Sequence, residues 1–234
     1  MAHTSEMHSL VGAPWEIYSI PEPRTIDLYT KSGDISVYSA MIALSPDHDV
    51  GFTIMSSGPS PGGATRSVPN LIVQDLISAL ESAAKEEADH RFSGTYALKN
   101  GKNSSITLVT DEGPGLKVTR WINNNEDMLD GVASLMKFGD RSQMNMRLQP
   151  TGLESPGQIS FRAIMTSPTL ESTVKGPFSL SCMTWVMADS QKYGNVGLDE
   201  FLFDVDDDGN AVSLSPRALR VSLPRRHGHG HDDC

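Results

Sequence analysis

Cysteine, aromatic residues and long apolar runs are all scarce in this chain of 234 residues. Of its two cysteines, Cys182 lies in an apolar run and Cys234 is the last residue. We expect a buried free thiol and a tail thiol instead of a disulfide, because chain ends are commonly too mobile to hold one. Runs such as "SAMIAL" and "LIVQDLISAL" are much shorter than the roughly 20 residues of a membrane-spanning helix. The sequence therefore predicts a soluble protein without a disulfide framework.

Positive charge is also in short supply, since 19 lysines and arginines stand against 29 aspartates and glutamates and the net charge is -10. No stretch gathers basic and aromatic residues together, so nucleic acid and membranes are poor candidate partners. The N-terminus lacks the cationic start and apolar core of a secretory signal, which favours a cytoplasmic location for the chain as given and leaves its compartment open. Asn103-Ser104-Ser105 is a glycosylation sequon that matters only in a secreted chain.

The first part of the chain, residues 15–58, reads as a series of β-strands. The segments "WEIYSI", "TIDLYT", "SVYSAMIAL" and "VGFTIMSSG" are rich in β-branched and aromatic residues and are separated by Pro, Gly and Asp turns. The short connection Pro46-Asp47-His48-Asp49 predicts an antiparallel hairpin. Residues 57–69 read as a loop by composition.

One long helix follows, from Val68 to about His90, and we expect it to lie across the strands. Its expected buried stripe consists of residues at helical spacing, and acidic and basic residues occupy the wet side. The stripe comprises Leu71, Ile72, Asp75, Leu76, Ala79, Leu80, Ala83 and Ala84, and the wet side comprises Glu81, Lys85, Glu86 and Glu87.

From Phe92 onward the pattern changes to short strands with frequent turns, which is typical of an all-β sandwich or barrel. Only residues 124–138 interrupt it, with a short predicted helix. The tryptophans, which lie in apolar strand contexts and are expected in the core, are Trp15, Trp121 and Trp185. We therefore divide the chain into residues 1–91, a β-rich domain at 92–224, and a disordered His-rich tail at 225–234.

The first candidate for chemistry is Lys31-Ser32-Gly33, within "YTKSGD". It reads as a polar connection that leads into the strand "SVYSAMIAL". A lysine and a hydroxyl on an edge strand, followed by a glycine that lets a ligand approach the backbone, can bind a carboxylate or an acyl group and help to form an oxyanion site. A solvated turn explains the same residues.

A strand with Lys-Ser/Thr-Gly, followed by an antiparallel hairpin and a long helix, resembles the end of the serine β-lactamase and penicillin-binding-protein fold. The stretch from "VGAPWEIYSI" to "VGFTIMSSG" is similar to the fungal β-lactamase-related serine hydrolases, and the β-rich part is similar to their C-terminal domain. The second similarity is carried by "FSGTY", "DEGPGLKVTRWI", "RLQPTGL", "CMTWVMADSQKYGNVGLDEFLFDVD" and "SPRALRVSL". The resemblance extends from about Val11 to Leu223 and implies an α+β fold. We expect a remnant antiparallel sheet with one long helix, followed by a mostly-β, barrel or sandwich-like domain.

The resemblance also implies which residues form the site. The Lys-Ser/Thr-Gly strand is one wall of the active site in that family, so Lys31 and Ser32 are the catalytic candidates, as a relic of the motif. The expected substrate-binding residues are Tyr29, Gly33, Asp34 and Tyr38.

In that family a Ser-x-x-Lys motif carries the nucleophile, a Tyr-x-Asn motif follows, and both precede the Lys-Ser/Thr-Gly strand. Here the strand begins 31 residues into the chain, so about the first two-thirds of the hydrolase fold has no counterpart and we expect the nucleophile to be missing. Ser82-Ala83-Ala84-Lys85 and Tyr193-Gly194-Asn195 fit the two patterns, but both follow Lys31, and the first lies inside the predicted helix. We interpret them as chance matches.

No metal ion or other cofactor is expected. Asp204 to Gly209, "DVDDDG", resembles the start of a calcium loop, but Ser215 stands where a bidentate glutamate belongs, so an acidic hairpin turn is favoured. The tail residues His227, His229 and His231 offer ligands without a fixed geometry. Weak metal binding at either place stays open.

These residues predict a truncated β-lactamase-like homologue that binds a small-molecule ligand without hydrolysing it, and whether it is an enzyme stays open. One alternative is a repurposed secondary-metabolism enzyme that cyclises or isomerises a polyketide or terpenoid intermediate. Another is a fragment of a full-length hydrolase or acyltransferase, of which family members often look secreted. An incomplete sheet would leave an edge that invites a second copy of the chain or a complementing hydrolase fragment.

Overall fold

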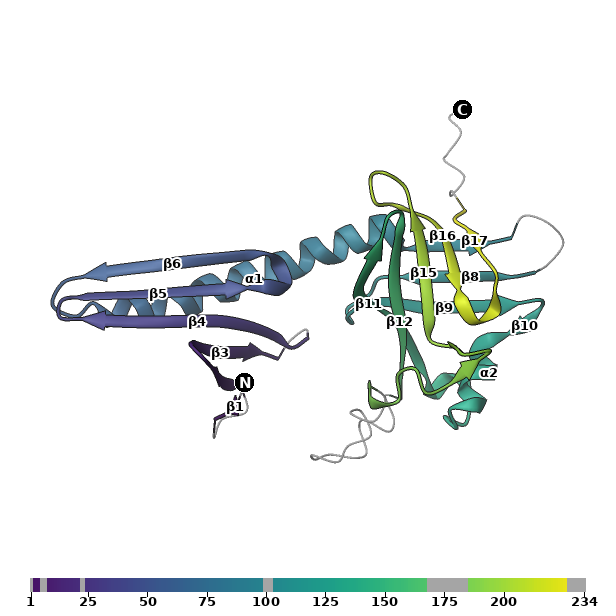
Figure 1. Ribbon diagram of the computed structural model, residues 1–234, viewed down its shortest axis with the longest axis horizontal. Coiled ribbons are helices and arrows are strands. Elements are labelled where there is room, and N and C mark those ends of the chain that lie inside the picture. The colour runs from purple at the N-terminus through teal and green to yellow at the C-terminus, as the bar shows by residue number, and fades with distance from the viewer. Residues whose placement is uncertain (1, 5–7, 22–23, 99–102, 168–184, 227–234) are drawn as a thin grey trace. The chain divides into compact units, whose positions relative to one another are not determined.

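The computed structural model describes residues 2–4, 8–21, 24–98, 103–167 and 185–226. The chain divides into two compact units, residues 1–85 and 86–234. Each unit contains its own antiparallel sheet, and one long helix covers a face of the first (Figure 1). The expected α+β class is confirmed, whereas the domain limits drawn from the sequence stay a prediction.

The first unit is built on a six-stranded sheet in which each strand pairs with its neighbours in the sequence. All of these pairs are antiparallel. The strands are β1 (Ala2–His3), β2 (Ser9–Gly12), β3 (Trp15–Ile20), β4 (Ile26–Ile35), β5 (Tyr38–Ser45) and β6 (Val50–Ser57). The four strands predicted between residues 15 and 58 are therefore confirmed.

Two tight turns set the register of the central strands. Ser36, between β4 and β5, has a φ of 54°, and Asp49 has a φ of 52° after the short 3-10 turn Pro46–His48 that joins β5 to β6. The hairpin predicted at this second turn is confirmed. The connection suggested at Lys31-Ser32-Gly33 is wrong, because these residues lie inside β4 and pair with β5. The chain reverses after them, at Ser36.

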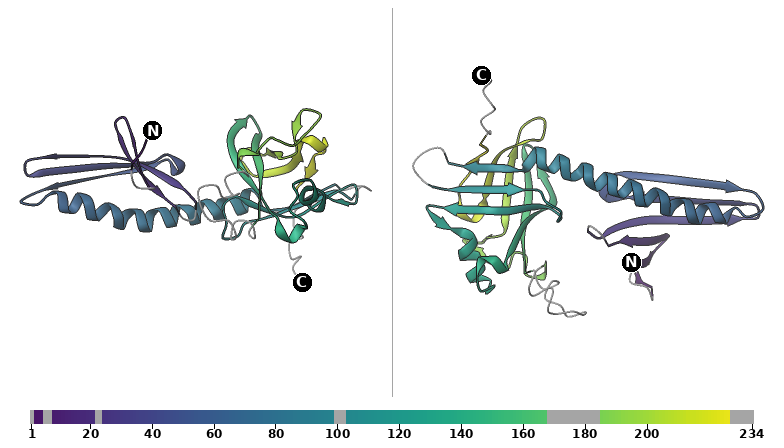
Figure 2. Two further views of the ribbon diagram at one scale, coloured as in Figure 1. Left: turned by 90° about the horizontal axis from the view of Figure 1, so that it is seen from below. Right: turned by 180° about the vertical axis from the view of Figure 1, so that it is seen from behind.

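Helix α1 (Gly62–Phe92) lies along one face of this sheet, as both views of Figure 2 show. Ile77 packs with Leu28 of β4 in a small buried cluster. Ser39 Oγ of β5 lies 2.7 Å from Thr65 Oγ1 of the helix. Because alternate residues of a strand share a face, these contacts identify the side of the sheet that the helix covers.

The helix differs from its sequence prediction in its start and in its phase. Residues 62–67 belong to it, although the composition of residues 57–69 suggested a loop. Leu71, expected in the buried stripe, is 64% exposed. Glu81, expected on the wet side, is partly buried and accepts a hydrogen bond from Arg24 at 2.9 Å. Apolar and alanine residues occupy several sides of this helix, so spacing alone does not determine which side faces the sheet.

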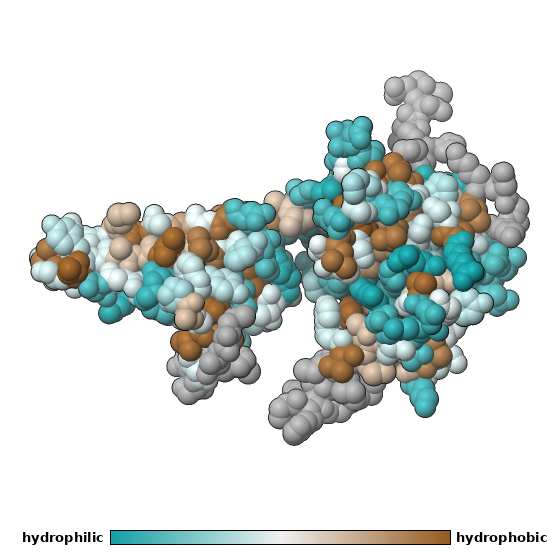
Figure 3. All heavy atoms as spheres, viewed as in Figure 1, coloured by the Kyte–Doolittle hydropathy of each residue, from teal (hydrophilic) through white to brown (hydrophobic). Residues whose placement is uncertain are grey.

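The opposite face of the sheet carries exposed apolar side chains. By alternation and strand pairing, Ile35, Tyr38 and Met55 lie together on the side away from the helix. They are 74%, 60% and 81% exposed. Figure 3 shows apolar residues, in brown, between polar ones on the side of these strands that faces the viewer. Among the described residues, the sheet thus has one covered face and one open face.

The second unit is a larger antiparallel sheet whose strands also follow their order in the sequence. The strands on its path are β7 (Gly94–Ala97), β8 (Ser105–Val109), β9 (Leu116–Asn123), β11 (Asn145–Ser155), β12 (Gln158–Thr166), β15 (Glu200–Val205), β16 (Ala211–Pro216) and β17 (Leu223–Pro224), and β10 (Glu126–Asp127) pairs with β9. Its two ends meet, because Tyr96 forms a bridge with Arg225 and the Arg226 N–H donates to the Thr95 carbonyl at 2.7 Å. The sheet therefore curls into a closed barrel (Figure 1).

Large aromatic side chains fill the interior of this barrel. Trp121, Phe201 and Phe203 are at most 1% exposed. The rings of Trp121 and Phe201 have centroids 5.3 Å apart, and those of Phe161 and Phe203 are 4.9 Å apart. The core position predicted for Trp121 is confirmed. The one predicted for Trp185 is wrong, because its residue is 58% exposed.

The second unit also contains the short helix α2 (Met128–Leu135), which confirms the helix predicted within residues 124–138. Its first turn is capped by Asp127, which accepts a hydrogen bond from the Leu129 N–H at 2.9 Å. Leu129, Val132 and Ala133 are buried.

Neither α1 nor α2, the two α-helices of the described residues, combines the length and hydrophobicity needed to cross a membrane.

Two alanine substitutions test the phase of α1. Ile77→Ala should lower the free energy of unfolding of the first unit by about 2–4 kcal/mol, because it leaves a cavity beneath β4. Leu71→Ala should change it by less than about 0.5 kcal/mol, because the Leu71 side chain is largely in solvent. Hydrogen exchange of the β4 amides in urea measures both values. An equal loss of unfolding free energy in both variants would contradict the assignment of the Ile77 side of α1 as the buried side.

Asp111 connects the loop before β9 to β11 of the second unit. Arg147 and Lys117 both pair with its carboxylate, and the Gly113 N–H donates to it. Burial raises the pKa of Asp111, but the hydrogen bonds and charges of these partners outweigh burial and hold the pKa at about 2. Because this lies below the ordinary value of 3.8, the resulting stabilisation is complete above about pH 4 and is lost as the pH falls toward about 2.

Asp111→Asn should therefore lower the free energy of unfolding at pH 7 by about 1 kcal/mol, a figure reduced for the partial exposure of the side chain. It should also flatten the dependence of stability on pH between about 4 and 2, so that variant and wild type converge at the acid end. Urea titrations followed by Trp121 fluorescence at several pH values measure this. The same slope in both proteins would contradict the assignment.

Candidate functional site

Lys31 and Ser32 of β4 both contact one glutamate of the neighbouring strand. Lys31 Nζ donates to Glu16 Oε1 at 2.6 Å, and Ser32 Oγ donates to Glu16 Oε2 at 3.1 Å. Lys31 Nζ also donates to the Ser32 carbonyl oxygen at 2.9 Å. Glu16 reaches this position because it pairs with Thr30 in the β3–β4 register. The first unit thus gathers an ammonium group, a hydroxyl and a carboxylate at its surface.

The Glu16 carboxylate is held in its ionised form. Its hydrogen bond with Lys31 and that with Ser32 lower the pKa of Glu16 below its usual value, although burial acts in the opposite direction. A carboxylate with a lowered pKa is a poor general base, because a base works best when its pKa is near the working pH. The Ser32 hydroxyl therefore donates to a carboxylate that has a low tendency to take up its proton.

The edge of β4 beside this cluster is unpaired. β3 pairs with β4 only from Ile26 to Thr30, whereas β5 pairs with it as far as Ile35. Among the described residues, no strand pairs with the other edge of β4 from Lys31 to Ile35, and we call this segment the Lys31 edge. A β-carbon at Gly33 would meet no atom within 4 Å. Backbone groups next to Lys31 are therefore open to an extended ligand.

Tyr29 and Asp34, two of the predicted substrate-binding residues, have other neighbours. The Tyr29 ring meets the Trp15 ring edge-on, with centroids 6.3 Å apart. A β-carbon at Gly62 would meet Asp34 Oδ1 at 3.9 Å, so the Asp34 side chain lies beside the start of α1. Both residues belong to β4 without joining the hydrogen bonds of the Glu16 cluster.

Tyr38, the remaining predicted residue, lies at the turn end of the β4–β5 hairpin, where it pairs with Ile35. Ile35 lies four positions after Lys31, which corresponds to about 13 Å along a strand. Tyr38 is therefore too far along the strand to share one small contact site with the Lys31 ammonium group. Lys31, Ser32 and Gly33 form the compact part of the predicted site.

The two segments that match Ser-x-x-Lys and Tyr-x-Asn lie in regular local structure. Ser82 Oγ donates to the Ser78 carbonyl at 2.9 Å in the middle of α1, so its hydroxyl is engaged within the helix. Tyr193-Gly194-Asn195 lies at the tip of a hairpin of β13 (Lys192–Tyr193) and β14 (Val196–Gly197). Gly194 and Asn195 have φ values of 58° and 64°, as a two-residue hairpin turn requires.

The acidic segment before β16 is a hairpin turn, as predicted. Asp206 accepts hydrogen bonds from the N–H groups of Asp208 and Asn210 at 3.1 and 2.8 Å, and Gly209 has a φ of 80°. In the part of the chain that the structure describes, no group of three or more His, Cys, Asp or Glu side chains is arranged to hold a metal ion. The tail histidines and both cysteines lie outside the described residues.

Sequence reasoning missed a serine–histidine–glutamate chain in the first unit. Ser45 Oγ lies 2.7 Å from His48 Nδ1, and His48 Nε2 lies 2.8 Å from Glu81 Oε1. Ser45 is 3% exposed and the His48 side chain is 5% exposed, so the hydroxyl is closed to a substrate. These hydrogen bonds connect the β5–β6 turn to α1. Glu81 follows His48 by 33 positions, and only the fold brings them together.

Comparison with known protein families identifies the second unit. Residues 84–227 match the family model described as "Beta-lactamase-like-like, C-terminal domain". This match covers most of the unit formed by residues 86–234. No solved structure matches the chain.

Three curated fungal proteins are similar to this chain. It is 28% identical over 252 aligned residues to a "Beta-lactamase-like protein" of Arthroderma benhamiae. The alignment covers 94% of this chain and 42% of that protein. It is 28% identical to the "Probable hydrolase clz13" of Cochliobolus lunatus, with 64% of this chain and 26% of that protein covered. It is 27% identical to the "Probable hydrolase M10" of a Phoma species, with 63% and 26% covered. The chain thus spans less than half the length of these relatives.

The pairing of Lys31 with Glu16 predicts how the site responds to anions. Glu16→Gln removes a competing carboxylate, so the affinity of Lys31 for benzoate at low salt should rise about threefold, within the ~0.2–1 kcal/mol of an exposed ion pair. Titrations that follow the amide NMR signals of Lys31 and Gly33 measure this. Glu154→Gln, at an exposed position of the second unit, is the matched control. An equal rise in both variants would show an effect of net charge alone.

Proposed function

The chain belongs to the beta-lactamase-like C-terminal domain family, and from that premise we propose that its Lys31 edge binds a small-molecule ligand without forming a covalent serine ester. Two of its relatives are named as probable hydrolases. Hydrolases act on polarised carbonyl or related groups, so a ligand that contains a carbonyl or carboxylate is the first candidate.

The observation that carries this proposal is an unpaired strand edge next to a cation. The carbonyl and N–H groups of an extended ligand can add to the backbone of the Lys31 edge as another strand would. The Lys31 ammonium group lies 2.9 Å from the Ser32 carbonyl oxygen, so it is within reach of a negatively polarised group bound at the same edge. The open space at Gly33 leaves room for the ligand beside the backbone.

The serines of the first unit whose contacts are described above do not favour a covalent step. A serine nucleophile needs an accessible hydroxyl and a base whose pKa is near the working pH. Ser32 contacts a carboxylate whose pKa is lowered, Ser82 donates to a helical carbonyl, and Ser45 is buried. We therefore favour ligand binding over hydrolysis for these 234 residues.

A second candidate is a complementing role, in which the chain supplies one wall of a hydrolase site. Two observations favour it. The alignment covers only 42% of the Arthroderma benhamiae relative, and the Lys31 edge belongs to a sheet whose open face carries exposed Ile35, Tyr38 and Met55. A second copy of the chain or a complementing hydrolase segment could pair with the edge and cover that face. The nucleophile would then come from the added polypeptide.

Covalent probes test the first candidate. The purified chain is incubated with a fluorophosphonate and with benzylpenicillin, and its intact mass is measured. We expect no adduct, together with saturable NMR shifts along the Lys31 edge during titration with benzylpenicillin. A stoichiometric adduct on Ser32 or Ser82 would overturn the non-covalent proposal, and the absence of any shift would overturn binding at this edge.

Gly33→Ala tests whether benzylpenicillin binds beside the backbone at Gly33. Its added methyl group meets no atom of the protein, so we expect the fold to be unchanged. The methyl group lies on the same side of β4 as Lys31, and benzylpenicillin affinity should fall about tenfold because the approach is crowded.

Mixing the chain with the unmatched part of the Arthroderma benhamiae relative tests the second candidate. Covalent labelling by the fluorophosphonate that appears only in the mixture, and that is lost when the chain carries Lys31→Ala, would favour complementation.

A further inference from the structure

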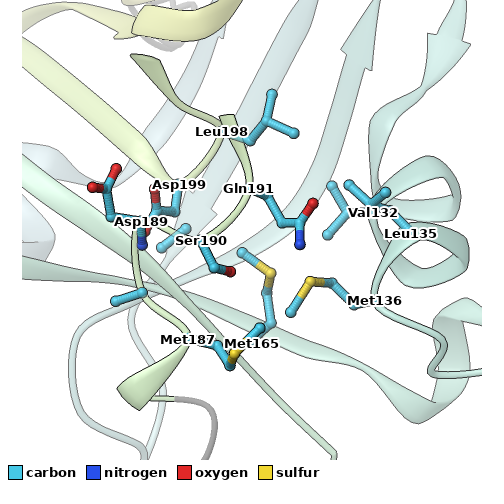
Figure 4. A pocket seen from close by; sticks show the side chains of 12 residues that line it. Val132, Leu135, Met136, Met165, Met187, Asp189, Ser190, Gln191, Leu198 and Asp199 are labelled. Atoms are coloured by element: carbon cyan, nitrogen blue, oxygen red, sulfur yellow. The ribbon is translucent and has the colours of Figure 1, made fainter. Parts of the chain in front are cut away.

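The second unit has a pocket formed by α2, β12 and the segment that precedes β15 (Figure 4). The pocket encloses about 30 Å³ of space and opens to solvent around it. Small-ligand sites are lined mainly by apolar side chains. The apolar wall here is composed of Val132, Leu135, Met136, Met165, Met187 and Leu198. Its lining is therefore typical of a ligand site, and because its enclosed space holds only about two water molecules, a larger ligand must displace the flexible side chains of the wall.

Three methionines give this wall an adaptable surface. Figure 4 shows Met136, Met165 and Met187 close together, although they come from three different parts of the sequence. Methionine side chains are flexible and polarisable, so they adjust to the shape of a bound molecule. Val132 is 7% exposed, whereas Leu135 and Met187 are 49% and 40% exposed. The pocket thus combines a buried apolar part with a rim that solvent reaches.

The two carboxylates beside the pocket are already paired. Asp199 accepts hydrogen bonds from Arg162 at 2.9 Å and from the Asp189 N–H at 2.7 Å. Asp189 pairs with Arg162 at 3.3 Å and with Lys192 at 3.0 Å. Two cations therefore balance two carboxylates. An anionic ligand would approach carboxylates without gaining a free cation, so the pocket favours a neutral ligand.

The side-chain amide of Gln191 lines the pocket and has no hydrogen-bond partner among the described residues. Figure 4 shows the carboxamide of Gln191 between Leu198 and Met136, directed toward the apolar wall. Within the described ranges, no hydrogen bond joins this carboxamide to another residue. A primary amide has two donors and an acceptor, and burying it unpaired beneath an apolar ligand costs free energy. Gln191 can therefore select ligands that carry a matching polar group.

We propose that this pocket binds a neutral, flexible and largely apolar small molecule with one amide, carbonyl or hydroxyl group that pairs with Gln191. The apolar part of the ligand contacts Met136, Met165 and Met187. The site lies within the second unit and uses none of the residues of the Lys31 edge. It goes beyond the function proposed above, and its failure would leave that proposal unaffected.

Titrations with octanamide, 1-octanol and octanoate test the ligand class. The chain contains 11 methionines, whose ε-methyl groups are followed by NMR and assigned by Met→Leu substitutions. We expect octanamide and 1-octanol to shift Met136, Met165 and Met187 saturably, and octanoate to bind about tenfold more weakly because its carboxylate meets the two aspartates. No saturable shift at these methionines, or equal affinity for octanoate, would overturn the proposal.

Gln191→Leu removes the amide at similar size. The affinity for octanamide should fall about tenfold in this variant, because the ligand amide loses its partner. Gln74→Leu, on the exposed side of α1, is the matched control and should leave the affinity unchanged. An unchanged affinity in Gln191→Leu would overturn the role of Gln191. Met187→Trp, at the exposed rim, should fill the pocket and abolish binding, and retained binding would overturn the location.

Discussion

The closed sheet of the second unit depends on the hydrogen bonds of Arg225. Its guanidinium group donates to the carbonyl oxygens of His90, Arg91 and Ser93 at 2.9, 3.0 and 2.6 Å. These carbonyls lie at the end of α1, where a helix leaves its last carbonyl groups without partners. The backbone of the same residue forms the bridge to Tyr96 that joins the last strand to the first. One side chain thus satisfies a helix end while its backbone removes the sheet edge, and the aromatic interior is sealed from solvent.

The first unit has no comparable closure among its described residues, and this difference determines where each unit can bind a ligand. Its β3 stops pairing at Glu16, so β4 continues with one free edge and the sheet keeps one open face. Charged side chains commonly protect such an edge from indiscriminate strand pairing. Lys31 and Glu16 provide that protection and at the same time mark the place where a ligand can add to the sheet. The second unit, whose interior is filled by its core side chains, has a pocket beside α2.

Features governed by local sequence were predictable, and features governed by contacts distant in sequence were not. Alternation and turn residues identified the strands, and helical spacing identified α1. The polar run through Lys31 looked like a turn because its residue types suit turns, yet the reversal occurs where Ser36 adopts a positive φ. The phase of α1 failed at Leu71 because several sides of the helix are apolar. The role of Glu16 was missed because it depends on the β3–β4 register, which no short pattern encodes. A role in secondary metabolism stays a prediction from resemblance alone.

The position of Glu16 also restricts which ligands the Lys31 edge can select. A simple anion must displace a carboxylate that already lies 2.6 Å from the lysine ammonium group, so its net gain is small. A neutral carbonyl that is aligned with the backbone of β4 forms strand-like hydrogen bonds without breaking the ion pair, and the ammonium group still polarises it from nearby. Binding through the edge and binding through the charge therefore favour different molecules. The geometry favours extended ligands that contain carbonyl groups over small free carboxylates. Only an extended ligand can form hydrogen bonds with the unpaired backbone of β4 and also contact the Lys31 ammonium group.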